Sequence, residues 1–246
     1  MGAALTLDTA PELSAVVPAY DEIESLPMLM GELRAALNST GKSYEIVLVD
    51  DGSKDGSPEW LLAESRRDPT LVPVLLEKNV GQSGALAAGI SRARGAIVIT
   101  LDADLQNDPA DLPRLLAALE NADVVSGIRM KRQDSRFRLL SSRIANATRR
   151  AVLGDPVTDI GCSFKVYRRE ALEGLPFFLG AHRFLPAMCV FRGSRFAEVP
   201  LTHRARRHGV SKYGLHNRLW KGLYDLVGVR WLKARLLRYR IREVPR

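Results

Sequence analysis

The sequence predicts an α/β fold, a mostly parallel sheet flanked by helices, with amphipathic helices towards the C-terminal end. Three observations lead to this prediction. Short β-branched runs alternate with longer helical patterns through the first half of the chain, which is typical of βαβ units. Polar residues gather directly after the predicted strands, and the second half changes to a strongly basic, helical pattern.

Five apolar runs of the first half are predicted to be strands, at residues 13–18, 44–50, 71–76, 96–101 and 124–128. The helices expected between them cover residues 25–38, 57–67, 81–93 and 109–120. The last helix has a clear start signal, because Asp108 is a good N-cap residue and proline, here Pro109, is favoured at the first helical position. Strands and helices therefore alternate as a mostly parallel sheet requires.

The second half is predicted to hold two basic amphipathic helices, at 136–153 and 215–239, and one strand at 163–168. The second helix combines Trp and Leu with many Lys and Arg, which is the composition of a helix that lies in a membrane interface. Arg230 and Lys233 belong to the cationic face expected to meet anionic lipid. A packing helix with a solvated charged face is the alternative interpretation.

The composition is that of a soluble globular protein. Of 246 residues, 46% are hydrophobic and 26% are charged, which excludes collagen-like, low-complexity and disordered chains. Cys162 and Cys189 cannot form a zinc site alone, and we expect them to be reduced in a cytoplasmic setting. The N-terminus lacks a signal-peptide pattern, and no window approaches the roughly 18 apolar residues of a spanning helix. Any membrane contact is therefore expected at the surface, on the cytoplasmic face.

The net charge of +8 divides into two opposite halves. Residues 1–127 carry 9 basic and 20 acidic side chains, whereas residues 128–246 carry 27 basic and 8 acidic ones. A basic half can bind phosphate, so a polyanion-binding module, for example for RNA, is one alternative function. That function leaves the acidic strand ends unexplained, and the sequence has no nucleic-acid motif. We therefore expect no nucleic-acid partner.

The predicted strand ends carry the residues best suited to bind a polar ligand, because ligands bind beyond the carboxyl ends of strands in open α/β sheets. Asp102 and Asp104 directly follow a buried strand. They can hold a hard divalent cation that bridges diphosphate oxygens, although Asp102 could instead cap the next turn. Asp50 and Asp51 end a second strand, and two acidic strand ends on one rim repel unless a cation or a hydroxyl network engages them.

The turn at residues 81–84 opens a predicted helix. Its backbone N–H groups, Gly81 included, could bind a phosphate, and a purely structural turn is the alternative. No Walker lysine follows this turn, and the first strand is not followed by G-x-G-x-x-G. P-loop and Rossmann dinucleotide sites are therefore poor interpretations. A sugar nucleotidyltransferase is disfavoured because no glycine-rich activation loop follows the first strand.

Basic residues of the second half are candidates to hold a second anion, since the planar guanidinium fork suits phosphate. Arg129 is favoured by its position at a strand end, and the other candidates are Lys131, Arg132, Arg143, Arg206, Arg207 and Lys212. Asp159 is a lone carboxylate among basic residues, which is more often an ion-pair partner than a general base. The four histidines have no metal-ligand spacing.

Four motifs together resemble the family 2 glycosyltransferases of the GT-A fold: VPAYDE at 17–22, VDDGSKDG at 49–56, NVGQSGALAAG at 79–89 and LDADLQNDP at 101–109. Further motifs are similar to the polyprenyl-phosphate branch, typified by dolichyl-phosphate mannose synthase: GIR at 127–129, DIG at 159–161, GAHRFLP at 180–186 and RRHGVSKY at 206–213. The resemblance covers nearly the whole chain. Many relatives continue into transmembrane helices, whereas this chain stops at Arg246.

The resemblance implies a role for particular residues. Those expected to bind the donor nucleotide are Pro18, Tyr20, Glu22, Asp50, Asp51, Gly81, Asp102, Ala103, Asp104 and Gln106. Asp102, Asp104 and Gln106 are also expected to surround Mg²⁺ or Mn²⁺. The acceptor phosphate is expected at Arg129, Arg143 and Arg206, with Ser211 and Lys212 in a loop that closes over the site. Asp102, Asp104, Arg129 and Asp159 form the expected catalytic set.

The expected activity is an inverting, metal-dependent transfer of a sugar from a nucleotide-diphosphate donor to a dolichyl or undecaprenyl phosphate, a hexosyltransferase reaction. UDP-sugar is the first expectation for the donor and GDP-mannose the second. Transfer to a saccharide hydroxyl, with Asp159 as base, is the alternative enzyme function. We expect a catalytic domain over residues 1–214, with a nucleotide-binding half at about 12–128 and an acceptor half at about 129–214, and a basic helix in 215–246. A separate membrane protein is retained as a candidate partner.

Overall fold

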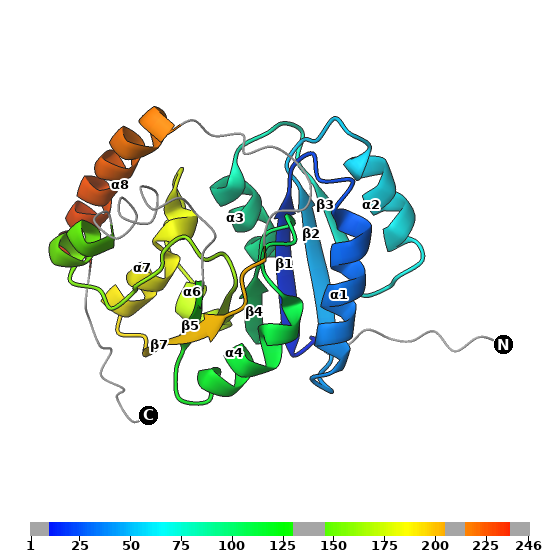
Figure 1. Cartoon of the computed structure of the whole chain (residues 1–246), viewed down its shortest axis with the longest axis horizontal. Coiled ribbons are helices and arrows are strands. Elements are labelled where there is room, and N and C mark those ends of the chain that lie inside the picture. The colour runs from blue at the N-terminus through cyan, green and yellow to red at the C-terminus, as the bar shows by residue number, and fades with distance from the viewer. Residues whose placement is uncertain (1–9, 130–145, 205–214, 237–246) are drawn as a thin grey trace, which may run out of the picture.

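Seven strands form one sheet in the order β3-β2-β1-β4-β6-β5-β7 (Figure 1). The structure is a computed structural model that describes residues 10–129, 146–204 and 215–236, with side chains in the last range from residue 222 onward. The strands are β1 (Leu13–Ala19), β2 (Tyr44–Asp50), β3 (Leu71–Leu75), β4 (Ile97–Thr100), β5 (Val124–Arg129), β6 (Lys165–Arg168) and β7 (Phe196–Leu201). The described pairs are parallel except those of β6, which runs antiparallel to β4 and β5. The predicted mostly parallel α/β sheet is confirmed.

The strand order reverses at β1, and this reversal brings two acidic loops together. β1 pairs with β2 along its whole length, up to the pair Ala19–Asp50. On its other side β1 pairs with β4, up to the pair Val16–Thr100. The loops that follow β1, β2 and β4 therefore emerge at the same edge of the sheet. In open α/β sheets such a switch point is where ligands bind.

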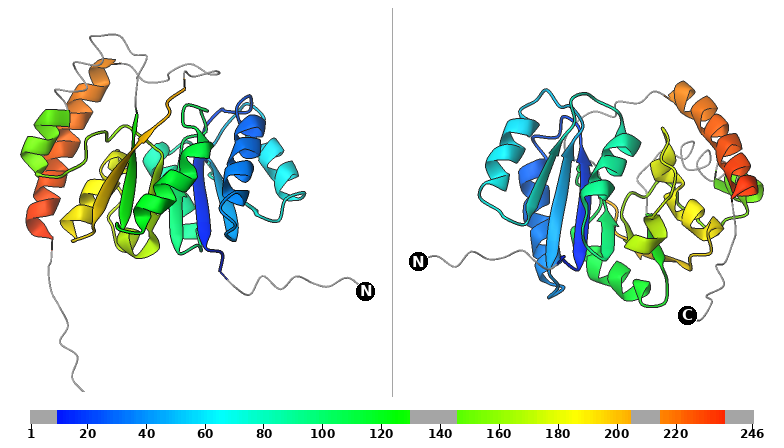
Figure 2. Two further views of the ribbon diagram at one scale, coloured as in Figure 1. Left: turned by 60° about the horizontal axis from the view of Figure 1, so that its bottom comes forward. Right: turned by 180° about the vertical axis from the view of Figure 1, so that it is seen from behind.

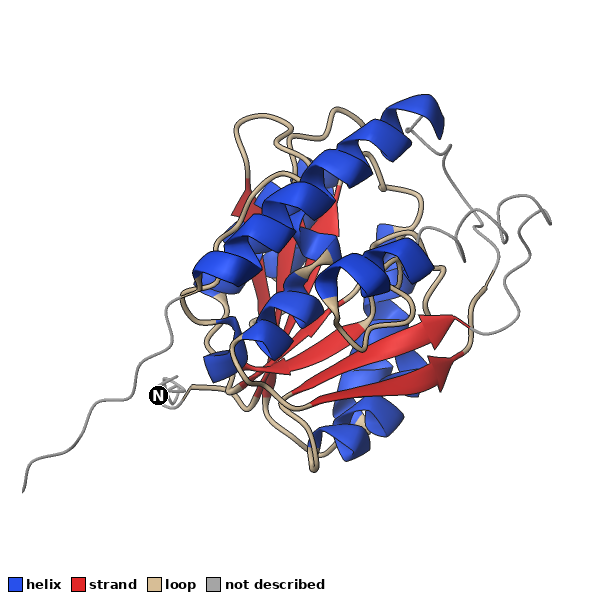
Figure 3. Ribbon diagram, turned by 90° about the vertical axis from the view of Figure 1, so that its left-hand side faces the viewer, coloured by secondary structure: helices blue, strands red, loops and turns tan. Residues whose placement is uncertain are grey.

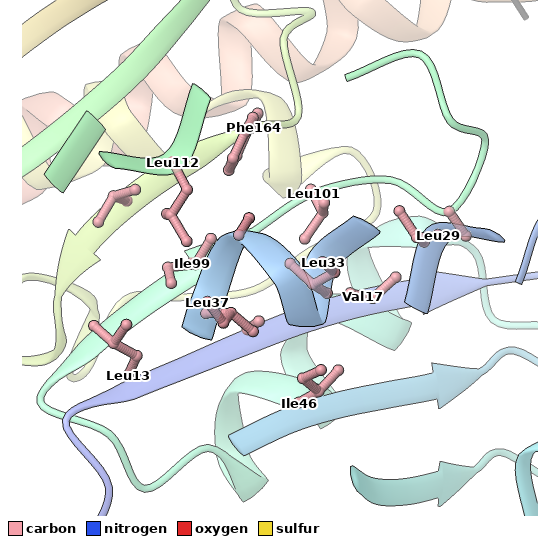
Figure 4. Close-up of a cluster of buried hydrophobic side chains, with 14 of the residues drawn as sticks. Leu13, Val17, Leu29, Leu33, Leu37, Ile46, Ile99, Leu101, Leu112 and Phe164 are labelled. Carbon is pink, nitrogen blue, oxygen red and sulfur yellow. The ribbon is translucent and has the colours of Figure 1, made fainter. Parts of the chain in front are cut away.

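Helices cover both faces of the sheet, as Figures 2 and 3 show. One face carries α1 (Leu26–Asn38), α2 (Ser57–Ser65), the short 3₁₀ helix η1 (Pro109–Asp111) and α4 (Leu112–Leu119); the other carries α3 (Gln82–Arg92), α6 (Arg169–Leu172), η2 (Ala181–Arg183) and α7 (Leu185–Phe191). Each face has its own core cluster, and alternation along β1 sends Val17 into the first and Val16 into the second. Figure 4 shows the first cluster, where Leu33 of α1 and Leu112 of α4 are fully buried.

Several predicted elements begin or end within a few residues of the observed ones. The N-cap prediction for Asp108 is confirmed, because its Oδ1 accepts a hydrogen bond from the Ala110 N–H at 3.0 Å. The helix after it begins as η1 and continues as α4. Within the predicted helix at 136–153, residues 146–153 are helical, and residues 136–145 lie outside the described part of the chain. Cys162 and Cys189 are both free and buried.

The elements β7, α6, η2 and α7 are absent from the sequence-based prediction. β7 contains Pro200, which argues against a central strand because proline cannot donate a ladder hydrogen bond. β7 is an edge strand, paired with β5 alone in the described sheet, and there the missing N–H is tolerated.

The last helix, α8 (Leu215–Arg235), packs against the helix of residues 146–153. Arg230 Nη1 donates a hydrogen bond to the Val152 carbonyl at 2.7 Å, and Lys233 Nζ donates to the Leu153 carbonyl. Carbonyls in the last turn of a helix lack intrahelical partners, and cations there also complement the helix dipole. Arg230 and Lys233, which were expected on a lipid-facing surface, therefore join α8 to the helix of residues 146–153. α8 begins at Leu215, but the division into domains stays a prediction.

The contact between α3 and the sheet depends on a glycine. A Cβ added to Gly89 would meet Val16 Cγ1 and would approach Val49 Cγ2 to 2.9 Å. Both valines are fully buried, so neither can move aside easily. We predict that Gly89→Ala lowers the free energy of unfolding by about 1–3 kcal/mol, the usual cost of overpacking, as measured by urea denaturation.

Gly31 in α1 provides the matched control for this substitution. No atom lies within 4 Å of a Cβ added to Gly31. Alanine is favoured over glycine in a helix, so Gly31→Ala should raise stability by about 1 kcal/mol. Equal effects of the two substitutions would contradict the proposed packing of α3.

Candidate active site

The loops that follow β1 and β2 are joined to each other by hydrogen bonds. The Asp21 N–H donates to Ser53 Oγ at 2.9 Å, and Asp21 Oδ1 accepts from the Lys54 N–H at 2.8 Å. The Ile23 N–H donates to Asp55 Oδ2 at 3.0 Å. Asp21 has a φ of 50°, a left-handed conformation uncommon outside glycine. These contacts hold the rim of the predicted nucleoside site in one conformation.

Asp51 joins this rim to the start of α3. Its buried carboxylate accepts hydrogen bonds from the N–H groups of Val80 at 2.8 Å and Gly81 at 2.9 Å. Burial raises the pKa of Asp51 above its usual value, and the two N–H donors oppose this shift. The Gly81 N–H, a candidate for binding phosphate, is therefore engaged by Asp51. This bond favours the structural interpretation of the turn.

The other residues predicted to bind the nucleoside lie at the same edge. Pro18 belongs to β1 and is half-buried, as are Tyr20 and Glu22 in the loop that follows. Asp50 is almost fully buried, and its Oδ2 accepts hydrogen bonds from the N–H groups of Gly52 and Ser53 at 3.1 and 3.0 Å. Its Oδ1 has no hydrogen-bond partner among the described residues. An orphaned, buried carboxylate oxygen is suited to accept a hydrogen bond from a ligand hydroxyl.

Asp102 and Asp104 place two interacting carboxylates after β4. Burial, and then the charge of Asp104, raise the pKa of Asp102 to about 6. Gln82 Nε2 donates to Asp102 Oδ1 at 2.6 Å, and the Gln106 N–H donates to Asp104 Oδ1 at 3.2 Å. Asp104 is 6% exposed. The pair carries negative charge in a place that water reaches poorly, so a bound cation would relieve its repulsion.

The residues at this position fit a hard divalent cation. Asp102, Asp104 and the Gln106 amide offer oxygen ligands, which Mg²⁺ and Mn²⁺ prefer, and Ala103 is buried between the two carboxylates. Across the described residues, no group of three or more His, Cys, Asp or Glu could hold a metal ion. Two carboxylates suffice for Mg²⁺ when substrate phosphates complete its coordination. The cation would therefore be held jointly by the protein and a diphosphate.

The residues that follow β7 form a strap, residues 202–204, over the loop after Asp104. Asn107 and His203 form an antiparallel bridge, and the Arg204 N–H donates to the Gln106 carbonyl at 2.8 Å. The Arg204 guanidinium pairs with Glu32 of α1 at 2.7 Å and with Asp108 at 2.6 Å. The strap therefore fixes the backbone of Gln106, a predicted metal ligand.

Arg129 and Asp159 form an ion pair with two hydrogen bonds. Arg129 Nε donates to Asp159 Oδ2 at 2.8 Å, and Nη2 donates to Oδ1 at 2.7 Å. Asp159 also accepts from the Gly161 N–H at 3.1 Å. This geometry agrees with the ion-pair interpretation of Asp159, and a role as base stays a prediction. The remaining predicted acceptor residues, Arg143, Arg206, Ser211 and Lys212, lie outside the described residues.

Three further polar residues surround Asp102, and the sequence-based site set omits them. They are Gln82 at the start of α3, Ser163 before β6, and Lys165 within β6. Lys165 is 3% exposed and lies opposite Thr100 of β4. A charged residue inside a predicted buried strand was the signal that could have identified it, because buried charges are rare unless they are paired.

The fold, together with the acidic loops after β1, β2 and β4, is typical of α/β proteins that bind nucleotides. The carboxylate pair after β4 is suited to bind a diphosphate together with a cation. Residues 14–175 match the family described as Glycosyl transferase family 2, and the chain belongs to this family. The predicted family and the predicted class of enzyme, a glycosyltransferase, are confirmed.

Two relatives are both named undecaprenyl-phosphate 4-deoxy-4-formamido-L-arabinose transferase. The protein from Edwardsiella ictaluri is 43% identical over 217 residues, which is 87% of this chain and 66% of the relative. The protein from Salmonella dublin is 42% identical over 224 residues, which is 89% of this chain and 68% of the relative. The chain therefore spans about two thirds of the length of these relatives.

Among solved structures, glucosyl-3-phosphoglycerate synthase from Mycobacterium tuberculosis, in complex with Mn²⁺, uridine diphosphate and phosphoglyceric acid, is similar with a TM-score of 0.69. The match covers 93% of this chain and 80% of that protein at 20% identity. A second mycobacterial protein matches with a TM-score of 0.67 at 21% identity, over 89% of this chain and 75% of that one. These similarities confirm the predicted GT-A fold.

The raised pKa of Asp102 predicts a pH-dependent difference in stability. Between its usual pKa near 3.8 and the folded value of about 6, the folded chain keeps a proton that the unfolded chain has lost. This proton stabilises the fold fully below about pH 4, and the contribution is lost as the pH rises through 6. Relative to Asp102→Asn, the metal-free wild type should therefore lose melting temperature between pH 4 and pH 7.

The difference between the two melting curves isolates Asp102, since the other titrating groups are common to both proteins. Thermal unfolding followed by circular dichroism at pH 4, 5, 6 and 7 measures it. A constant difference across this range would show that the Asp102 carboxyl titrates as an ordinary exposed group.

Proposed function

We propose that the protein transfers a sugar from a nucleotide-diphosphate donor to the phosphate of a polyprenol, with inversion at the anomeric carbon. The observation that carries this proposal is the carboxylate pair at the switch point of the sheet, in which Asp104 is buried and Asp102 is half-buried. The name of the two relatives, undecaprenyl-phosphate 4-deoxy-4-formamido-L-arabinose transferase, supports a lipid phosphate as the acceptor. The uridine diphosphate and Mn²⁺ in the M. tuberculosis neighbour support a UDP-sugar, ahead of GDP-mannose, as the donor.

On the donor side, the loops after β1 and β2 bind the nucleoside, and the loop after β4 binds the diphosphate. Asp50 offers an orphaned carboxylate oxygen to a ribose hydroxyl. Asp102, Asp104 and Gln106 would hold Mg²⁺ or Mn²⁺. When bound, the cation would supply positive charge to stabilise the leaving nucleoside diphosphate.

On the acceptor side, the nucleophile is an oxygen of the lipid phosphate. A phosphate monoester has its second pKa near 6, so at neutral pH this oxygen is already deprotonated. It forms a bond to the anomeric carbon while the bond from that carbon to the diphosphate oxygen breaks. The protein then acts mainly by positioning the reactants and stabilising charge. Arg129, oriented by its ion pair with Asp159, is placed to hold the acceptor phosphate.

A saccharide hydroxyl as acceptor would need a general base, and Asp159 is the candidate on this chain. Both of its carboxylate oxygens accept hydrogen bonds from Arg129, which favours a role of Asp159 in positioning Arg129 over a role as proton acceptor. This observation supports the phosphate acceptor over the hydroxyl acceptor.

We propose that α8 lies on the anionic surface of the membrane, on the cytoplasmic side. Leu223, Tyr224, Val227 and Trp231 are exposed large apolar residues on this helix, and Tyr224 is 82% exposed. Exposed Arg230 and Arg235 lie beside them. An apolar stripe with aromatic residues and flanking cations is suited to a lipid interface. No helix in the described part of the chain is long and apolar enough to cross a membrane.

The activity is tested by release of nucleoside diphosphate from a panel of UDP-sugars and GDP-mannose, with Mn²⁺ and a short polyprenyl phosphate. Release should depend on the lipid phosphate. Asp104→Asn should reduce the rate by roughly 100-fold or more, because charge stabilisation by a cation amounts to several kcal/mol.

Asp123→Asn is the control for this variant, because Asp123 lies before β5, at the opposite edge of the sheet from the loops. It should retain nearly the full rate. Release that depends on a saccharide and ignores the lipid phosphate would overturn the proposed acceptor.

The membrane contact predicts a loss of vesicle binding without a loss of nucleotide binding. Val227→Ser combined with Trp231→Ser should weaken sedimentation with vesicles of anionic phospholipid by roughly tenfold or more, since each buried apolar side chain contributes about 1.5–3 kcal/mol. Leu62→Ser is the control, because Leu62 is a 40% exposed residue on α2, at the other side of the molecule in Figure 1. Equal vesicle binding by all three proteins would contradict the proposal for α8. Arg230 and Lys233 are unsuited to this test, since they hold helix 146–153.

A further inference from the structure

A small pocket beside Asp102, on the side of the sheet covered by α3, is lined by both polar and apolar side chains, Leu86 and Leu101 among the latter. Gln82, Asp102, Ser163, Lys165 and His182 supply its polar lining. Its volume of about 10 Å³ leaves room for about one water-sized group. Asp102 therefore lines this pocket and is also a proposed ligand of the cation.

Lys165 presents a buried ammonium group to the pocket. Within the described residues Lys165 Nζ donates a hydrogen bond to the His182 carbonyl at 3.3 Å, although an ammonium has three N–H donors. Burial lowers the pKa of Lys165, while the charges of Asp102 and Asp159 favour its protonated form. A buried cation is stable only with well-placed acceptors, so Lys165 is suited to bind an oxygen atom in the pocket.

His182 presents a second donor to the pocket. Ser83 Oγ accepts hydrogen bonds from the backbone N–H groups of Gly180 at 3.0 Å and His182 at 3.4 Å. Its own proton is therefore available for His182 Nδ1, which lies 2.7 Å away. Burial, with the charges of Lys165 and Arg183, lowers the pKa of His182 to about 3, so the ring is neutral. With Nδ1 as acceptor, the ring proton of His182 is on Nε2.

The order of the strands indicates which part of a donor would reach this pocket. The loops proposed for the nucleoside follow β1 and β2, and the carboxylates proposed for the diphosphate follow β4. The pocket is lined by Thr100 of β4 and Lys165 of β6, and β6 is the next strand along the sheet. The group next to the diphosphate on the side away from the nucleoside is the sugar.

We propose that this pocket binds one hydroxyl group of the donor sugar, with Lys165 and His182 as hydrogen-bond donors and Asp102 as acceptor. A hydroxyl both accepts and donates, which matches two donors and one carboxylate. An apolar substituent would leave Lys165 with the His182 carbonyl as its hydrogen-bond acceptor and would add none. The subsite rests on the proposed function, because it requires a nucleotide-sugar donor. It makes Lys165 and His182 determinants of sugar specificity.

The test compares binding of a nucleoside diphosphate and of its sugar conjugate by calorimetry with Mn²⁺. The probes are UDP and GDP against UDP-glucose, UDP-galactose, UDP-xylose and GDP-mannose. Lys165→Met should weaken binding of the sugar conjugate that the wild type prefers by roughly 10- to 100-fold, the range for hydrogen bonds to a charged group. Binding of the matching nucleoside diphosphate should stay within about threefold of the wild type.

His182→Asn is a second variant, because it shortens the side chain while an amide can still contact Ser83, and it should have the same selective effect. Lys42→Met, at an exposed lysine paired with Glu12, is the matched control and should change neither affinity. Lys165→Met removes one buried charge and leaves those of Asp102 and Asp159, which lowers stability. Melting temperatures check that all three variants are folded under the conditions of the binding measurement.

Deoxy analogues of the preferred sugar identify the hydroxyl. Removing one hydroxyl should weaken binding to the wild type as much as Lys165→Met does, and should cost the variant nothing further. If Lys165→Met weakened the binding of the nucleoside diphosphate and of the sugar conjugate equally, the proposal would be overturned, because the pocket would then hold a water that supports Asp102. Unchanged affinities in both variants would overturn it as well. A wild type that binds neither class of probe would overturn the proposed function itself.

Discussion

The repulsion between two carboxylates fixed after β4 is the interaction on which the rest of the rim depends. Asp102 and Asp104 lie where water reaches poorly, and the raised pKa of Asp102 expresses the unfavourable energy of holding both charges. The surrounding contacts keep the pair in place despite that energy: Gln82 holds Asp102 from α3, and the strap at residues 202–204 holds the loop after Asp104. A site arranged in this way gains stability from a bound cation, because the cation relieves the repulsion between the two carboxylates.

Much of the fold follows from features visible in the sequence. The apolar runs predict β1, β2, β4 and β5 closely because those strands are buried on both faces, and the polar residues after them mark the switch point. β7 could not be predicted, because Pro200 and Glu198 give it the pattern of a loop and its pairing with β5 depends on tertiary context. The antiparallel direction of β6 is likewise a property of the assembled sheet.

Part of the candidate site is also predictable from the sequence. The carboxylates at the strand ends are identified by position alone, because no other residues of a buried parallel sheet reach solvent there. The residues of the neighbouring pocket cannot be identified in this way. Lys165 and Ser83 both form hydrogen bonds with His182, which is 17 and 99 positions away from them in the sequence. The bond between Asp51 and the Gly81 N–H shows the same limit, because a turn that looks open to phosphate in the sequence is closed by a residue 30 positions earlier.

The reversed direction of β6 has a consequence for how the chain could diversify. Parallel strands contribute the residues that follow them to the rim, whereas β6 contributes those at its beginning, Ser163 and Lys165. Apart from Thr100, Leu101 and Asp102, the residues that line the pocket come from one continuous stretch, residues 163–182, and from α3. Exchange of that stretch between relatives would alter one part of the ligand site and leave the β1 and β2 loops intact. Recognition of the two ends of a donor can thus change independently within one sheet.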